Sequence, residues 1–156
     1  MNTEELGTWY ADWMWSLPLI VVNVVIHIFG FALIYNKVVG VLGSAMARLR
    51  FLSMFAAVMG VTVTLATILH GIEAAVWAAA YWSLGAMPDI RSAMLYSLGA
   101  MTTYGHANVY LQDQWRLMGA LEALNGMLLF GLTTAFLFAM IQNVSLLGSR
   151  ERHSKS

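Results

Sequence analysis

Long apolar runs alternate with short polar segments along the chain. Residues 17–36, 51–84 and 115–147 each form a run long enough to cross the hydrocarbon core of a bilayer, which takes about 20 helical residues. A fourth run, residues 89–103, is shorter than a comfortable crossing and has the length of a re-entrant helix. The pattern predicts an all-α membrane protein with three transmembrane helices, and the path of the fourth run decides its topology.

The distribution of Lys and Arg favours a re-entrant path for residues 89–103. Basic residues beside membrane helices collect on the cytoplasmic side. If this run crosses fully, the basic residues divide four against four, and if it enters and returns, six oppose only Arg91 and Arg116. The six are Lys37, Arg48, Arg50, Arg150, Arg152 and Lys155. The bias predicts a re-entrant pore helix between the second and third membrane helices, with the N-terminus outside and the C-terminus in the cytoplasm.

The two prolines and one aspartate mark expected helix starts. Proline is tolerated in the first turn of a helix, so we expect Pro18 to open the first membrane helix and Pro88 to open the short helix. Asp89 then lies at the positive end of the short helix, and the partially negative end points toward Thr102 and Thr103. Such an end attracts cations.

Composition agrees with a membrane protein and excludes several other classes. Of 156 residues, 60% are hydrophobic and 10% charged, which leaves too few charges to cover a soluble surface. Eight basic and eight acidic residues balance, so nothing indicates nucleic-acid binding. Glu4, Glu5 and Asp12 stand where a secretory signal would be basic, so we expect the first helix to be retained. The chain has no cysteine, no HExxH pattern and no phosphate-binding loop, so we do not expect an enzyme.

The segment that follows the short helix combines a threonine pair with a glycine. At membrane depth, such a turn allows backbone carbonyls to face an aqueous pore. Its residues are Thr102, Thr103, Tyr104, Gly105, His106, Ala107 and Asn108. The segment indicates an ion channel.

From about residue 87 to residue 141, the chain resembles the pore module of potassium channels. In an alignment without gaps, Thr102 and Thr103 match the family's threonine pair, and the next five residues fall on its Val, Gly, Tyr, Gly and Asp. Residues 115–126 are similar to small bacterial channel-like proteins with an extra N-terminal helix. The resemblance implies three parts: an N-terminal segment (1–45), a pore module (46–148) and a short cytoplasmic tail (149–156).

The resemblance also implies an assembly and a permeant ion. One re-entrant segment cannot enclose a pore, so the expected form is a homotetramer in membrane lipid. Filter carbonyls at residues 103–107 would replace the hydration shell of a monovalent cation, which is potassium in the family. No other cofactor or metal is expected, and the bacterial relatives imply the inner membrane.

Three residues depart from the family's filter. Ala107 replaces a glycine in a left-handed conformation that costs other residues roughly 1 to 2 kcal/mol, and Asn108 removes a ring of negative charge. His106 replaces tyrosine and, when protonated, would repel the permeant cation. Alternatively, His106 is neutral, packed behind the turn and hydrogen-bonded there, with Tyr96 as the candidate partner. Potassium selectivity therefore stays open, as does a non-conducting structural or regulatory subunit with a channel fold.

Three residues of the last membrane helix are candidates for filter support or gating. By resemblance, Glu122 lies beside the pore helix and braces it, while Asn125 lies closer to the cavity. For Asn125, an interhelical hydrogen bond is an equal alternative. Gly126 is either a gating hinge or a close helix contact.

Polar residues also occur in the first two membrane helices. His70 and Glu73 are three residues apart and share a helix face, so we expect a structural ion pair between them. Asn23 and His27 share a face of the first helix. A remote alternative function is haem binding by His27 and His70.

Overall fold

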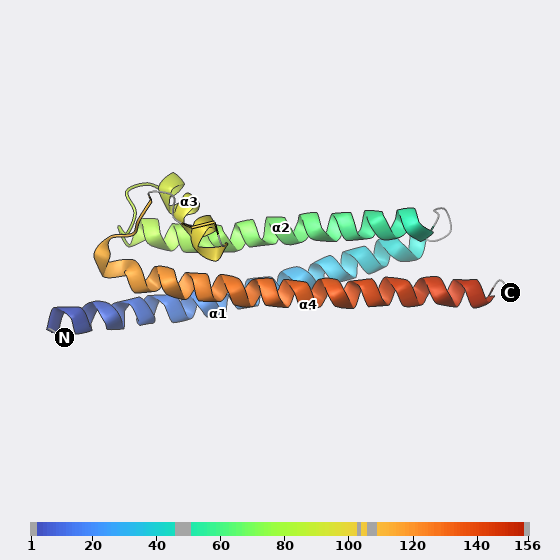
Figure 1. The fold of residues 1–156 in the computed structure, drawn as a ribbon, viewed down its shortest axis with the longest axis horizontal. Helices are drawn as coiled ribbons and strands as arrows, with labels where there is room; N and C mark the ends of the chain where they lie inside the picture. The colour runs from blue at the N-terminus through green and yellow to red at the C-terminus, as the bar shows by residue number, and fades with distance from the viewer. Residues whose placement is uncertain (1–2, 46–50, 103, 106–108, 155–156) are drawn as a thin grey trace. The chain divides into compact units, whose positions relative to one another are not determined.

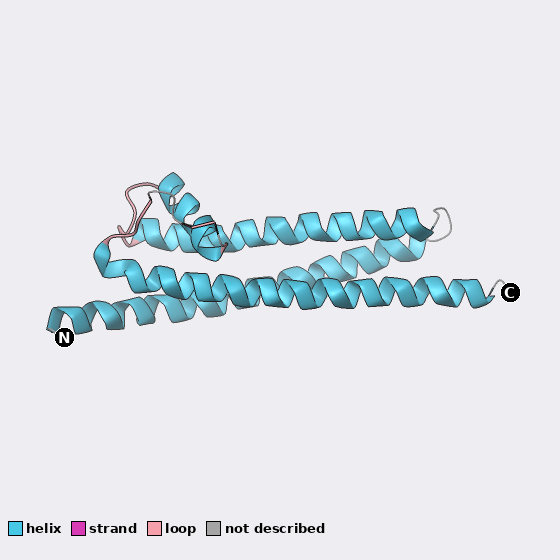
Figure 2. Ribbon diagram, in the orientation of Figure 1, coloured by secondary structure: helices cyan, strands magenta, loops and turns pink. Residues whose placement is uncertain are grey.

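Every regular element that the structure describes is a helix. The structure is a computed structural model that describes residues 3–45, 51–102, 104–105 and 109–154 (Figures 1 and 2). In chain order the elements are α1 (Thr3–Ala45), α2 (Phe51–Ser83), α3 (Ile90–Met101), the 3-10 helix η1 (Asp113–Trp115) and α4 (Arg116–Ser154). The all-α prediction is confirmed.

Three stretches within the described residues are long and apolar enough to cross a membrane. They are Gly7–Val38 in α1, Ser53–Ser83 in α2 and Asp113–Asn143, which spans η1 and most of α4. Many of their large apolar side chains face outward, including Phe29 and Phe138, with 67% and 61% of their surface exposed. Such continuous apolar surface is suited to lipid. The three predicted membrane helices are confirmed by length and composition.

Both prolines lie at positions other than those predicted. Pro18 is inside α1, which begins at Thr3, so the prediction that it opens this helix is wrong. The apolar run marks the part of α1 suited to lipid, whereas the helix itself continues into the more polar residues before it. Membrane helices tolerate an internal proline because neighbouring groups can satisfy the freed carbonyl. Pro88 precedes Asp89, the N-cap of α3, and therefore also lies before the first helical turn.

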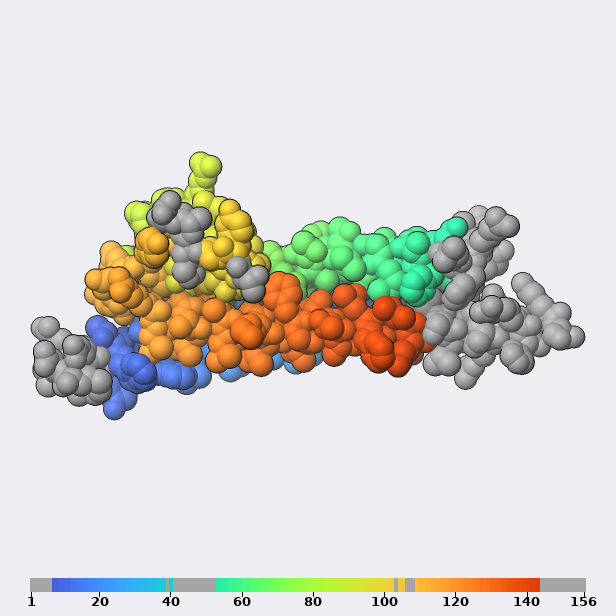
Figure 3. Space-filling model, in the orientation of Figure 1, coloured from blue at the N-terminus to red at the C-terminus, as the bar shows by residue number. Residues whose placement is uncertain are grey.

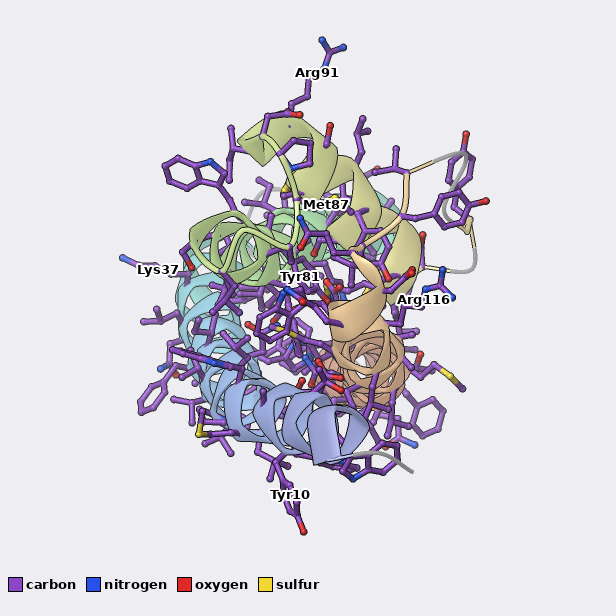
Figure 4. The ribbon with its side chains drawn as sticks, turned by 90° about the vertical axis from the view of Figure 1, so that its left-hand side faces the viewer. Tyr10, Lys37, Tyr81, Met87, Arg91 and Arg116 are labelled. Carbon is purple, nitrogen blue, oxygen red and sulfur yellow. The ribbon has the colours of Figure 1, made fainter. Side chains whose placement is uncertain are left out.

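The chain divides into two compact units, each built from segments that are distant in sequence. The first unit contains Met1–His27 and His70–Phe130. It includes α3, and its buried core contains Trp77, Tyr81 and Met118, none of which has measurable exposed surface. Figure 4 shows Tyr81 directed into the helix bundle, whereas Arg91 points away from it. All described residues of the predicted filter and its support belong to this unit.

The second unit contains Ile28–Leu69 and Gly131–Ser156. Its interior is apolar: the rings of Phe31 and Phe136 stack with their centroids 4.2 Å apart. Gly30 lies against the Leu69 side chain, which leaves no room for a Cβ at that position. This unit is formed by parts of α1, α2 and α4 and contains none of the predicted site residues.

Candidate functional site

The short helix α3 begins at a capped N-terminus. Asp89 has an extended backbone, and its Oδ1 accepts a hydrogen bond from the Ser92 amide at 2.9 Å. Its Oδ2 accepts a second hydrogen bond from the Ser92 hydroxyl at 2.7 Å. The donated hydrogen bonds from Ser92, the backbone one first, lower the pKa of Asp89, because they stabilise the charged carboxylate. The predicted placement of Asp89 at the positive end of the short helix is confirmed.

The segment that connects α2 to α4, and that contains α3, begins and ends at neighbouring positions. The Gln112 amide donates a hydrogen bond to the Ala86 carbonyl at 3.4 Å. The Ala86 amide in turn donates to the carbonyl of Tyr81, near the end of α2, at 2.9 Å. The two ends of the segment between Ala86 and Gln112 are therefore joined beside the end of α2.

Glu122 connects α3 to the two long helices around it. The Tyr81 hydroxyl of α2 donates to Glu122 Oε2 at 2.7 Å, and the Ser97 hydroxyl of α3 hydrogen-bonds to Oε1. The Ser97 Oγ also lies 2.8 Å from the Ala74 carbonyl of α2. Glu122 is completely buried, and both of its oxygens have a hydroxyl partner. The carboxylate therefore lies where α2, α3 and α4 meet, beside the short helix as the resemblance placed it.

Two glycines of α4 allow α3 to approach closely. A Cβ on Gly119 would lie 2.1 Å from the Tyr96 hydroxyl oxygen, and a Cβ on Gly126 would lie 2.7 Å from both the Cα and the carbonyl oxygen of Met101. These glycines are seven positions apart, about two helical turns, and so share one face of α4. The space-filling view shows α3 lying over the first part of α4 (Figure 3). Small residues at a helix contact permit this close approach in membranes.

Tyr96 belongs to the same contact. Its ring meets the Tyr81 ring edge to face, with centroids 5.5 Å apart and an interplanar angle of 88°. This geometry is favoured between aromatic rings. His106, its proposed hydrogen-bond partner, lies outside the described residues, so the role of Tyr96 in supporting the filter stays a prediction.

The described part of the predicted filter begins at the end of α3. Thr102 caps this helix: its amide and its hydroxyl both donate to the Leu98 carbonyl, at 3.1 and 2.6 Å. Gly105 has a φ of +83°, a left-handed conformation that glycine adopts without strain. Tyr104 lies between them and is 83% exposed in the single chain. The other predicted filter residues, Thr103, His106, Ala107 and Asn108, lie outside the described residues.

Asn125 lies one turn from Glu122 and is also completely buried. Among the described residues, neither polar atom of its side chain has a hydrogen-bond partner. A buried polar group without a partner costs about 1 to 3 kcal/mol, so this amide is unfavourable for the stability of the single chain. The interhelical hydrogen bond considered for Asn125 is not formed within the described part of the chain.

Sequence reasoning did not identify the partners of Glu122. Its position in an apolar helix signals that it needs donors, because an unpaired carboxylate is costly in a membrane. Several hydroxyl-bearing residues occur in the neighbouring segments, and the sequence does not show that Tyr81 and Ser97 are the two that reach it.

A second polar cluster lies where α1 meets α2 in the first unit. His70 Nδ1 is 2.8 Å from Glu73 Oε2, so the predicted pairing is confirmed. His27 Nδ1 of α1 is 2.7 Å from the other oxygen, Oε1. Both imidazoles therefore hold the same carboxylate. Haem binding by His27 and His70 stays an alternative prediction.

Comparison with known protein families identifies the class of this site. Residues 69–143 match the model of a family described as "Ion channel". The matched segment contains the last part of α2 from residue 69, all of α3 and η1, and α4 as far as the end of its apolar part. These residues form an ion channel domain, which confirms the resemblance to a channel. Comparisons with curated proteins and with solved structures found no match.

The family match and the three apolar helices together define the protein broadly. It is an integral membrane protein with an ion channel domain, and its general role is ion transport. The Glu122 junction, α3 and the described filter residues all lie within this domain.

Proposed function

We propose that the chain is one subunit of a homotetrameric cation channel whose pore resembles that of potassium channels. In this proposal α2 is the outer helix, α3 the re-entrant pore helix, residues 103–107 the filter, and α4 the inner helix. The observation that carries the proposal is the contact between the backbone of Met101, at the end of α3, and Gly126 of α4.

The position of this contact along α4 supports a re-entrant path. Gly126 lies inside the apolar stretch Asp113–Asn143 and is 13 positions after its first residue. At about 1.5 Å per residue this corresponds to roughly 20 Å along the helix, a large part of a hydrocarbon core of about 30 Å. The chain then returns to Gln112, which is hydrogen-bonded beside the end of α2. A pore loop consists of a helix that enters the membrane and a loop that returns to the side from which the helix entered.

The surface of the single chain supports an assembly. Apolar side chains on α3 and α4 are exposed, including Leu95 at 56% and Met127 at 71%. One such loop cannot surround an ion by itself. A closed ring of identical subunits would supply the other sides of the pore. Lipid would cover the outward faces that remain.

The charge pattern around α3 supports cation conduction. Asp89 caps the positive end of the helix, so the negative end is directed toward Thr102 and the filter. The permeant ion is a monovalent cation, with potassium the family precedent. Because Ala107 and Asn108 depart from the family's filter, the proposed outer ion sites are weaker than the inner sites formed near Thr103.

The membrane and orientation also belong to the proposal. The excess of basic residues on one side supports an external N-terminus and a cytoplasmic C-terminus. The similarity of residues 115–126 to small bacterial channel-like proteins supports the bacterial inner membrane. In this proposal the chain consists of an N-terminal segment (1–45), a pore module (46–148) and a cytoplasmic tail (149–156).

Reconstitution into liposomes tests the proposal. Purified protein should form four-subunit particles in native mass spectrometry and should conduct cations in parallel potassium, sodium and proton flux assays. Potassium-selective flux supports an intact filter, and unselective cation flux supports a channel with an altered outer filter. Folded tetramers that carry no flux would overturn conduction in favour of the structural or regulatory subunit. A stable assembly with another number of subunits would contradict the pore geometry.

A further inference from the structure

One carboxylate and two imidazoles meet at the contact of α1 with α2 in the first unit. Glu73 is completely buried, His27 is 1% exposed, and His70 is 13% exposed. One ligand-capable atom from each residue lies within 4.8 Å of the other two. None of these three side chains is among the hydroxyl partners of Glu122.

We propose that His27, His70 and Glu73 bind one divalent transition-metal ion of the zinc class, which fastens the first helix to the ion channel domain. His70 and Glu73 belong to the segment that matches the channel family, whereas His27 comes from the helix that precedes it. The site does not depend on whether the channel conducts.

The distances fit such an ion after a small adjustment. Zinc binds imidazole nitrogen and carboxylate oxygen at about 2.0 to 2.2 Å, so two tetrahedral ligand atoms are roughly 3.3 Å apart. The present separations are 2.7 Å from His27 Nδ1 and 2.8 Å from His70 Nδ1 to their carboxylate oxygens. Since the two nitrogens face different oxygens of Glu73, a common ion requires each nitrogen to move about half an ångström from its oxygen and the three ligand atoms, now within 4.8 Å of one another, to turn toward one point.

The two rings are also suitably placed. Two imidazoles on one tetrahedral ion hold their centroids roughly 5 Å apart, given the usual zinc to nitrogen distance. The His27 and His70 centroids are 5.4 Å apart, with the planes inclined by 42°. The helix spacing already brings both nitrogens to one carboxylate, so binding would require no rearrangement of α1 or α2.

Donor chemistry selects the class of metal. Imidazole with carboxylate suits zinc, copper, cobalt and nickel, whereas magnesium and calcium prefer sites made only of oxygen. Three protein ligands leave a fourth position for water. Each imidazole would bind the ion through Nδ1 in its neutral form, with its ring proton on Nε2.

Neighbouring groups hold the ligands in place. The Asn23 side-chain amide donates to the Glu73 backbone carbonyl at 3.3 Å, which ties α1 to α2 one turn before His27. The His70 ring stacks on Phe130 with centroids 4.4 Å apart. Such supporting contacts fix the orientation of metal ligands.

Titration of the purified, chelator-treated full chain with Zn²⁺ tests the site. Calorimetry should show one ion bound per chain, and the bound ion should raise the midpoint of thermal unfolding. His27→Gln, His70→Gln and Glu73→Gln should each weaken binding by at least about tenfold, because each removes a direct ligand. The matched control is His153→Gln, which removes a histidine 80 positions after Glu73 in the sequence and should bind like the wild type.

Cobalt gives a readout that needs no variant. Co²⁺ bound to the wild-type chain should show the strong visible absorption of tetrahedral cobalt, and Zn²⁺ should displace it. The proposal is overturned if the wild type binds neither ion stoichiometrically, or if its cobalt spectrum is that of octahedral, hydrated cobalt. It is also overturned if the three folded glutamine variants bind Zn²⁺ as tightly as the wild type.

Discussion

The backbone of Met101 rests directly on Gly126, with no space for a side chain between them. A Cβ at position 126 would lie 2.7 Å from the Met101 Cα and 2.7 Å from its carbonyl oxygen. Since both are backbone atoms, the contact is relieved only by moving the end of α3. This relationship supports close packing, one of the two predicted roles of Gly126, and places the end of α3 against the first third of α4.

Gly126→Ala should therefore destabilise the channel domain and reduce ion flux. Overpacking of this kind costs about 1 to 3 kcal/mol, and here it displaces the helix that leads into the filter. Thermal unfolding and liposome flux measure the two effects. Gly131→Ala is the matched control, because no atom lies within 4 Å of the position its Cβ would take. Equal behaviour of the two variants would show that the close contact has no consequence.

Glu122→Ala should be more damaging than Glu122→Gln. Alanine leaves the buried Tyr81 hydroxyl without its acceptor, at a cost of about 1 to 3 kcal/mol, whereas the Ser97 hydroxyl can still donate to the Ala74 carbonyl. Glutamine keeps one carbonyl oxygen as an acceptor and should retain part of the stability. Chemical or thermal unfolding in detergent measures the stability of the three proteins, which should decrease from the wild type to Glu122→Gln to Glu122→Ala.

The control for Glu122 is Asp113→Ala, which breaks an exposed ion pair with Arg116. Exposed pairs contribute little to stability, so this variant should unfold like the wild type. If Glu122→Ala were as stable as this control, the three-helix junction would not hold α3 in place.

Asp89 should make the stability of α3 depend on pH in the acid range. Its folded pKa lies below the ordinary value of 3.8, because the charged carboxylate accepts hydrogen bonds from Ser92. The stability it contributes is therefore present above that ordinary value and is lost as the pH falls through the lowered folded pKa. Thermal unfolding from about pH 7 to pH 2 should show this loss in the wild type.

Asp89→Asn isolates this titration, because asparagine caps a helix about as well as aspartate and has no acidic proton. The difference in unfolding midpoint between the wild type and Asp89→Asn should shrink on acidification. A difference that stays constant throughout that range would contradict the assignment of the lowered pKa to Asp89.

His106 carries the one prediction that rests on the sequence alone. If it lies beside the ion path, cation flux should fall as the pH decreases from about 8 to about 5.5, because histidine gains charge near pH 6.5. His106→Gln should remove this dependence, and His153→Gln should retain it. Flux of the wild type that does not change with pH would favour the alternative of a neutral histidine packed behind the turn.

The sequence by itself determined the class of protein and the number of its membrane helices. The length of an apolar run depends only on consecutive residues. About 20 of them can span the hydrocarbon core whatever other helices they contact. The same holds for Asp89 and for the pairing of His70 with Glu73, since an N-cap and a helix face depend only on nearby residues. Pro18 was misplaced because the helix begins before the apolar run does.

Only the tertiary structure decided which distant groups meet. Glu122 binds hydroxyls from Tyr81 and Ser97, and Glu73 holds His27 as well as the predicted His70. Contacts between helices depend on their rotation and depth, and a change of one residue in either turns a side chain by about 100°. Periodicity along one chain does not encode that register. The close approach at Gly126 belongs to the same kind of information, and it is this contact that turns a short apolar segment into a candidate pore helix.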